Sequence, residues 1–376
     1  MGISIQSEGG HWISVQLKQD KSESGVECVD GKVDDAHLVT SLPSYLFTYQ
    51  VHIVDSITSG NLSSRAHDSD STIFHPLFSF LNIPYSFHKT KSASSIKEIA
   101  LNLNLKDKHL FLFLSGDTSI SEFTNSIFQN KSYDGNCMDI LLLPFPMGTG
   151  NSFCSSIGLT NVLDSLTALF TGKISHFPIY KAKFSNPVTL VNNITPPPLC
   201  NEALFFVVLS WGLHSAFVYE ADKIEMRSKY GTERFKIAGN KIISSDPTFY
   251  GKIDEEFEPL SYLAITAMPN FEPSYLISPN SIPDKDELHL VKMPHLPPAE
   301  ITKLLISAYD NGSHLKDARV EYKSIKDMFS FSIKKDTPFE FSCICVDGTI
   351  YRIDSSVENS ISVTAVKQNN LRYIHL

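Results

Sequence analysis

The sequence has no apolar run of about 18 residues, the length with which a helix crosses a bilayer. Its first residues interleave Glu8, His11 and Lys18 with apolar ones, so the apolar core of a signal peptide is also missing. The six cysteines show neither CxxC spacing nor the density of a small disulfide scaffold. These absences predict a cytoplasmic protein that has no transmembrane segment and no cysteine-built zinc site.

Positive charge is also scarce: 32 Lys and Arg face 41 Asp and Glu, a formal net charge of -9. A nucleic-acid binder normally presents a basic face, so no nucleic-acid partner is expected. The GxxxxGK[ST] phosphate loop is absent. With 376 residues, of which 42% are apolar and 19% charged, the chain is an ordinary globular one with room for two domains.

Two strand-loop-helix units stand out in the first half of the chain. Residues 110–114 and 140–143 are all apolar, as in strands of a parallel sheet that are buried on both faces. Small and polar residues follow each run, at 115–119 and 146–152. Turns at the carboxyl ends of parallel strands face one crevice, and amides at helix starts attract anions. The pattern therefore predicts a site for nucleotide phosphates.

The order of patterns predicts an α/β plus β fold. Residues 46–174 alternate strand and helix signals, which indicates a doubly wound parallel-sheet nucleotide domain. Residues 175–376 favour a mainly antiparallel, β-sandwich-like domain. Its strands include 203–211 and 261–268, its one predicted helix spans 299–309, and Asp347-Gly348 marks a hairpin turn. Residues 1–45 are not placed beyond one or two edge strands.

Individual residues in the two turns allow more than one interpretation. Gly148 and Gly150 let the backbone approach a ligand, although a plain turn uses the same residues. Ser119 and Glu122 have the spacing of a capping box, which would tie Glu122 to its own helix terminus. Asp117 at a strand end suits a metal or a proton, or else an Asx turn.

The ordered motifs resemble the diacylglycerol-kinase catalytic domain superfamily of lipid kinases, which includes the sphingosine kinases. The motifs that carry this resemblance are Ser115-Gly116-Asp117 with Glu122 and Asn125, Pro146-x-Gly148-Thr149-Gly150-Asn151, Leu209-Ser210-Trp211-Gly212 with Tyr230-Gly231 and Arg234-Phe235, and Val346-Asp347-Gly348. The resemblance spans roughly residues 50 to 355 and implies a kinase that uses ATP and Mg²⁺. It also implies that the β-rich domain, residues 175–376, holds the lipid substrate.

The resemblance also implies roles for single residues. Asp117 matches the general base for the lipid hydroxyl and a metal-binding acid. Trp211 and Gly212 match a substrate-binding segment. The residues matched to the nucleotide site are Thr90, Ser115, Gly116, Thr118, Ser119, Glu122, Gly148, Thr149, Gly150, Asn151 and Asp347. In phosphoryl transfer the main role of such groups is to position the phosphate and the hydroxyl.

The chain departs from the family pattern at four positions, one of which is Ser119, where threonine or leucine is usual. Thr118 stands where glycine is usual, where a Cβ would oppose a positive φ; Thr349 replaces a glutamate, and Ala216 falls near an acid that meets the lipid head group. The function expected is phosphorylation of a lipid primary hydroxyl, most of all that of a sphingoid long-chain base, by a protein peripheral on internal membranes. The alternatives are a pseudoenzyme of the same fold that binds lipid or nucleotide without turnover, and a soluble NAD kinase-like enzyme.

Overall fold

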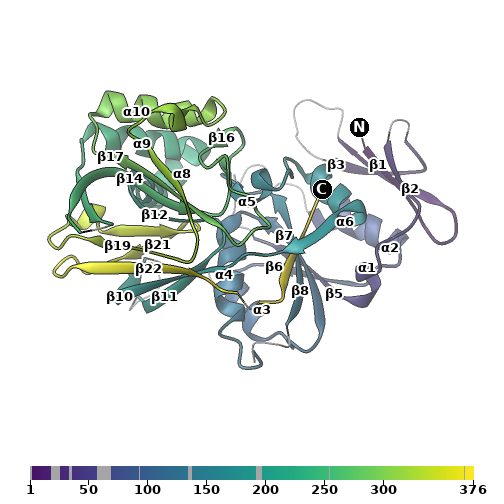
Figure 1. Ribbon diagram of the computed structural model, residues 1–376. Coiled ribbons are helices and arrows are strands. Elements are labelled where there is room, and N and C mark those ends of the chain that lie inside the picture. Colours follow the sequence, from purple (N-terminus) through teal and green to yellow (C-terminus); the bar gives the residue numbers. More distant parts are fainter. Residues whose placement is uncertain are drawn as a thin grey trace. The chain divides into compact units, whose positions relative to one another are not determined.

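The chain divides into two compact units, shown in Figure 1. The computed structural model describes residues 2–17, 26–33, 36–56, 69–92, 94–133, 138–191, 197–253, 255–367 and 369–376. Unit 1 comprises Met1–Phe177 together with Asn369–Leu376, and unit 2 comprises Pro178–Gln368. The sequence pattern predicts the last eight residues to be part of the β-rich domain, whereas in the structure they belong to unit 1. Among the described residues, no helix is both long and apolar enough to cross a bilayer.

Unit 1 is built on a mainly parallel sheet. Its strands, in spatial order, are β6 (Tyr85–Lys89), β5 (Gln50–Asp55), β7 (Lys108–Ser115), β8 (Asp139–Pro146), β23 (Leu371–His375) and β9 (Lys173–His176). All neighbours pair in parallel except β23 with β9. The spatial order reverses between β5 and β7, which is the kind of switch point where open α/β sheets bind ligands. The predicted parallel sheet is confirmed.

The helices of unit 1 follow the strands in the βα rhythm expected from the sequence. They are α1 (Tyr45–Thr48), α2 (His75–Phe80) after the π-helical turn η2 (Asp70–Phe74), α3 (Ser95–Leu101), α4 (Asp117–Ile127), α5 (Ser152–Ser156) and α6 (Val162–Thr171). Helix α6 starts with a capping box in which Asn161 and Asp164 bind each other's backbone amides.

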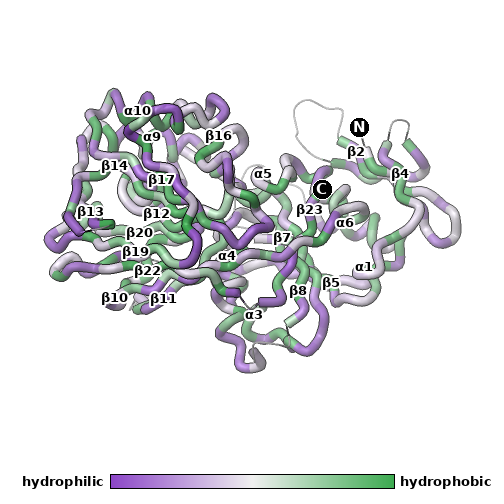
Figure 2. The backbone as a smooth tube through the Cα atoms, viewed as in Figure 1, coloured by the Kyte–Doolittle hydropathy of each residue, from purple (hydrophilic) through white to green (hydrophobic). Residues whose placement is uncertain are grey.

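The core of unit 1 forms around β7 and β8. Residues 110–114 are at most 1% exposed, because both faces of the strand are covered. Phe111 and Phe113 both contact Phe123 of α4 with ring centroids 4.6 and 5.3 Å apart. Figure 2 shows hydrophobic residues gathered along such central strands and hydrophilic residues at the outer turns. This packing fixes where the loops after β7 and β8 begin.

The N-terminal residues form a separate small sheet of unit 1. Its order is β3 (Val26–Asp30), β2 (Trp12–Leu17), β1 (Gly2–Gln6) and β4 (Ala36–Val39), with β1 and β4 parallel. The sequence suggests only one or two edge strands here. The additional strands β1, β3 and β4 are only four or five residues long, too short for a firm periodic signal. Ser4 of β1 and Ser14 of β2 are buried opposite each other and are hydrogen-bonded at 2.7 Å.

Unit 2 is a mainly antiparallel β structure, as predicted. Its main sheet contains β10 (Tyr180–Leu190), β11 (Leu199–Phe205), β12 (Val208–Gly212), β13 (Phe249–Lys252), β14 (Glu258–Thr266), β17 (Leu288–Pro294), β18 (Glu321–Ile325), β19 (Met328–Ile333), β20 (Cys343–Val346), β21 (Thr349–Arg352) and β22 (Asn359–Ala365), and β15 (Asn270–Glu272) pairs with β16 (Tyr275–Leu276) apart from it. The pairing runs β12-β20-β21-β10-β22-β19-β13-β14, and β14 pairs again with β12. The hydrogen bonds therefore close a ring, whereas a sandwich-like domain was expected.

Turns and helices complete unit 2. Asp347 and Gly348 have φ of 47° and 80° and connect β20 to β21, which confirms the predicted hairpin. Helix α10 (Pro298–Ile306) with its 3₁₀ extension to Tyr309 occupies the predicted helical segment. Three further helices, α7 (Leu213–Ala221), α8 (Ile224–Tyr230) and α9 (Arg234–Ser244), were not predicted from the sequence.

Candidate functional site

The turns after β7 and β8 lie in direct contact. The register pairs Ser115 with Pro146, so both strands end at the same level of the sheet. A Cβ added to Gly148 would lie 2.5 Å from Gly116 Cα and 3.0 Å from Gly116 N. Only glycine at position 148 permits this approach, so the structure brings the two predicted phosphate turns together through their backbones.

Asp117 connects the two turns. It is the first residue of α4, and its carboxylate accepts hydrogen bonds from the N–H groups of Ser152 (2.7 Å) and Phe153 (3.2 Å) at the start of α5. Burial raises the pKa of Asp117 to about 6, while these amide bonds act in the opposite direction. The carboxylate thus caps α5, and it stays largely ionised at neutral pH.

Asn151 closes the second turn on itself. Its backbone has φ of 51°, and its side chain both accepts from Gly148 N–H (2.7 Å) and donates to Gly148 O (2.9 Å). The amide of Gly148 is therefore used within the turn. Among the described residues none accepts a hydrogen bond from Gly150 N–H, and this amide is the donor that the turn offers to an anion.

Helix α4 starts differently from the capping-box interpretation. Its N-cap is Gly116, and Ser119 N–H donates to Gly116 O at 3.1 Å. Glu122 accepts instead from the backbone amide of Lys97 in α3, and burial raises the Glu122 pKa to about 7. The capping box between Ser119 and Glu122 is thus wrong, and Glu122 connects two helices.

Three further predicted residues occupy the same edge of the sheet. Thr118 lies inside α4 with helical backbone, so the glycine that the family uses there is not required by a positive φ in this chain. Ser115 is buried, and its hydroxyl donates to Gly116 O at 3.3 Å. Thr90 follows β6, is buried, and donates its amide to Asp55 O at 2.9 Å.

The predicted residues of unit 2 lie in the interior of that unit. Asp347 is 2% exposed, and its carboxylate accepts from the amides of residues 206, 207 and 208 at 2.9, 3.0 and 2.8 Å. Trp211 is fully buried, and its indole packs against Phe249, Phe331 and Gly251. Gly212 has φ of 85° and starts α7. These groups build the ring of strands and its adjoining turn.

The residues around Asp117 do not form a metal cage of their own. Over the described part of the chain, no group of three or more His, Cys, Asp or Glu is arranged to hold a metal ion. Mg²⁺ in kinase sites is bound through one or two carboxylates together with the phosphates of the substrate. Asp117 as a single partly buried carboxylate beside an anion-binding turn fits that arrangement.

Comparison with known proteins supports the same family. Residues 58–182 match the family model of the diacylglycerol kinase catalytic domain, which confirms the resemblance over that stretch. Over 96 residues, or 26% of this chain, the sequence is 29% identical to sphingosine kinase B of Dictyostelium discoideum, and the match spans 12% of that protein.

Solved structures extend the likeness to the fold of most of the chain. Two crystal structures from Bacillus anthracis str. Sterne, described as a diacylglycerol kinase or a candidate for one, have TM-scores of 0.56 and 0.52 at 14% and 12% identity. Each similarity covers 87% of this chain and 97% of the other. At such identities the likeness concerns the fold alone.

Proposed function

We propose that this chain, in which residues 58–182 match a diacylglycerol kinase catalytic domain, transfers the γ-phosphoryl group of ATP to the hydroxyl of a lipid. The observation that carries the proposal is the backbone contact between Gly116 and Gly148, with the Asp117 carboxylate beside it. A sphingoid long-chain base is the preferred acceptor, on the resemblance of the segment around Trp211 and Gly212.

Each residue of the site would have a separate role in phosphoryl transfer. The amide of Gly150 and the hydroxyl of Thr149 would hold the phosphates of ATP. Asp117 would accept the proton of the lipid hydroxyl, because a pKa of about 6 leaves it ionised at neutral pH yet basic enough to share a proton. Each carboxylate oxygen keeps lone-pair capacity beyond its amide bond. Mg²⁺, bound by the phosphates with Asp117, would neutralise the developing charge.

A second candidate function is binding without turnover. The Asp117 carboxylate already caps α5, and the Asp347 carboxylate already accepts from three amides, so both acids have structural partners. Thr349 stands where the family uses a glutamate. A protein of this kind would bind nucleotide or lipid and release no ADP.

The decisive experiment measures phosphate transfer to a panel of acceptors. Purified protein is incubated with labelled ATP and Mg²⁺ and with vesicles that carry sphingosine, diacylglycerol or ceramide, or with NAD as a soluble acceptor. We expect label in a lipid, and a loss of about 10²–10⁴-fold in Asp117→Asn, the usual contribution of a general base. Asp164→Asn is the matched control, because it removes a carboxylate that only caps α6.

Each alternative has its own result in this assay. Label in NAD but in no lipid would identify a soluble kinase. Lipid or nucleotide binding without ADP release would identify the non-turnover protein, and equal labelling by the wild type and Asp117→Asn would remove Asp117 from the mechanism. Because the acceptor lies in a bilayer, the protein should also sediment with liposomes that contain the labelled lipid. Failure to sediment with any lipid mixture would count against a membrane substrate.

A further inference from the structure

Three histidines form a hydrogen-bonded string across adjacent strands of unit 1. His88 Nε2 on β6 lies 3.1 Å from His52 Nδ1 on β5, and His52 Nε2 lies 3.0 Å from His109 Nδ1 on β7. His109 Nε2 lies 2.9 Å from the carbonyl oxygen of Asn104. His52 and His109 are buried, whereas His88 is partly exposed.

The carbonyl at one end fixes the direction of the string. The Asn104 oxygen can only accept, so the neutral His109 carries its proton on Nε2 and accepts on Nδ1. His52 then donates through Nε2 and accepts on Nδ1, and His88 donates through Nε2. Burial lowers the pKa of His52 to about 3, an effect reinforced by His109 and His88, so its ring is neutral. The one ring nitrogen left over is Nδ1 of His88, to which no described residue bonds.

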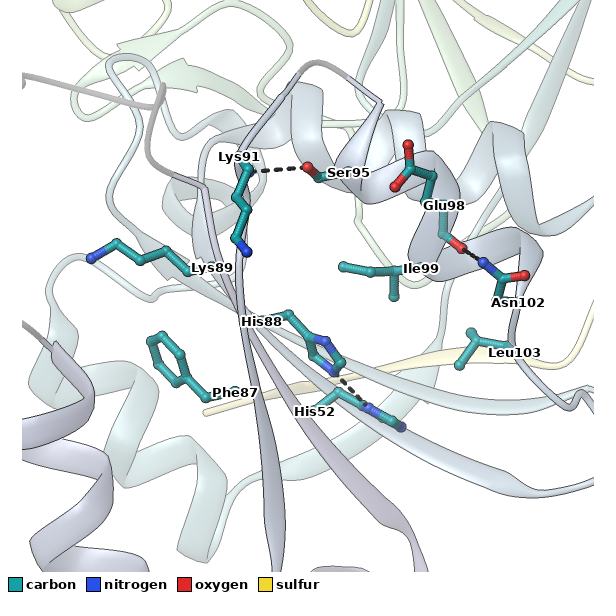
Figure 3. A pocket seen from close by; sticks show the side chains of 10 residues that line it. All are labelled: His52, Phe87, His88, Lys89, Lys91, Ser95, Glu98, Ile99, Asn102 and Leu103. Carbon is teal, nitrogen blue, oxygen red and sulfur yellow. Dashed lines mark hydrogen bonds between the residues drawn. The ribbon is translucent and has the colours of Figure 1, made fainter.

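This end of the string lines a pocket, shown in Figure 3. The pocket has a volume of about 630 Å³, within the range of small-molecule sites. It lies between β5 and β6 on one side and α3 on the other. The lining residues are His52, Phe87, His88, Lys89, Lys91, Ser95, Glu98, Ile99, Asn102 and Leu103.

The pocket has a basic end and an apolar wall. In Figure 3 the side chain of Lys91 points toward His88, whereas that of Lys89 points away. Ile99 and Leu103 face His88 and His52 from α3 and the loop after it. The other charged group of the lining, Glu98, is bonded to Ser94 Oγ at 2.6 Å. Of the charged side chains that line the pocket, Lys91 therefore points toward His88, whereas the Glu98 carboxylate points away from the ring and already has a partner.

We propose that this pocket binds a small amphiphilic acid, a carboxylate with a short alkyl chain, and that binding is coupled to uptake of one proton at Nδ1 of His88. The carboxylate would accept from this new N–H and lie near the Lys91 ammonium, and the alkyl chain would cover Ile99 and Leu103. A proton at Nδ1 leaves every bond of the string intact, which is true of no other ring nitrogen in it. The three histidines can therefore gain a positive charge without losing a hydrogen bond only at the ring nitrogen of His88 that lines the pocket.

Calorimetric titration of the full chain with octanoate, in two buffers of different ionisation enthalpy, tests the proposal. We expect saturable binding and uptake of close to one proton, because burial lowers the pKa of His88 and favours the neutral ring before the acid binds. Binding should be weaker at about pH 8 than at about pH 6, since the proton is scarcer at the higher pH. Octanoate should bind at least about tenfold more tightly than acetate, which has the same carboxylate but no chain for the apolar wall.

Matched variants separate this pocket from general charge effects. Lys91→Ala should weaken octanoate binding by about tenfold, as expected for a hydrogen bond between charged groups. Lys89→Ala removes the same charge at the same rim and should leave the affinity within about twofold. His88→Gln keeps a donor for His52 and should abolish proton uptake. Should this variant misfold, nitrogen-detected NMR of the wild type can show whether Nδ1 of His88 takes up a proton from solvent when octanoate binds.

Several results would overturn the proposal: no saturable octanoate binding, equal affinity for acetate, no proton uptake, or equal losses in Lys91→Ala and Lys89→Ala. Lipid phosphorylation is measured separately. Its failure would leave the pocket untouched, because the two sites share no residue.

Discussion

Replacing Asp347 should destabilise unit 2 in two graded steps. The carboxylate accepts hydrogen bonds from three buried amides. Oδ2 accepts from Phe206 N–H, and Oδ1 accepts from the N–H groups of Val207 and Val208. Asp347→Ala leaves all three without this acceptor, and we expect a loss of about 3–5 kcal/mol in the free energy of unfolding. Asp347→Asn keeps one oxygen for two amides and turns an NH₂ group toward the third, which should cost about 1–3 kcal/mol.

Urea unfolding followed by the fluorescence of Trp211 measures this loss. The chain has two tryptophans, so a Trp12→Phe background leaves Trp211 as the single reporter, buried within the same unit as Asp347. Asp336 provides the control, because it too is an aspartate with positive φ, of 64°, but it is exposed. Asp336→Ala should change the free energy of unfolding by no more than about 1 kcal/mol.

The reasoning would be refuted if Asp347→Ala stayed within about 1 kcal/mol of the wild type, since the amides would then have other acceptors. If Asp347→Asn and Asp347→Ala lowered the free energy of unfolding equally, Oδ1 would not be accepting from two amides and Oδ2 from one, as the distances indicate.

Two further predictions concern unit 1 and a reference helix. Gly148→Ala should lower the free energy of unfolding by about 1–3 kcal/mol in the same urea assay and abolish any kinase activity, because its Cβ would collide with Gly116. The control is Gly239→Ala in α9, where no atom lies within 4 Å of a new Cβ, and it should raise the free energy of unfolding by up to about 1 kcal/mol. A tolerated Gly148→Ala would mean that the two turns are not in contact. Folding raises the pKa of Glu122 from 4.5 to about 7, so as the pH rises this carboxyl group ionises in the unfolded chain before it ionises in the folded one. The free energy of unfolding therefore declines as the pH rises from about 4.5 to about 7. Glu122→Gln should therefore match the wild type in thermal melts below pH 4.5 and exceed it above about pH 7, and parallel curves would contradict this explanation.

The sequence predicted the elements whose signals are local. The apolar runs at 110–114 and 140–143 became the central strands β7 and β8, and Asp347-Gly348 became a hairpin turn, because both signals depend on neighbouring residues only. Helices α7 and α8 were missed for a related reason. Helix α7 is apolar around most of its circumference and α8 buries no residue, so neither shows the amphipathic period of a surface helix.

The parts of the site that were not predicted depend on contacts between distant residues. Asp117 accepts from amides 35 and 36 residues away, and Glu122 accepts from Lys97 in a different helix. Neither hydrogen-bonding partner can be predicted from the spacing of residues within either segment. The histidine string has the same character, because its members lie 36 and 57 residues apart and meet only through the register of the parallel strands.

The return of the chain to unit 1 decides how the protein can be divided. Unit 2 is one uninterrupted segment whose two ends run side by side, Tyr180 opposite Ala365, so it can be excised by two cuts. Unit 1 cannot be isolated by truncation at Phe177, because β23 fills the place between β8 and β9 and its removal would leave both strands with a bare edge. The amide of Phe177 binds the carbonyl of Leu371 at 3.0 Å, so a short peptide joining residue 177 to residue 369 would make unit 1 a single continuous polypeptide.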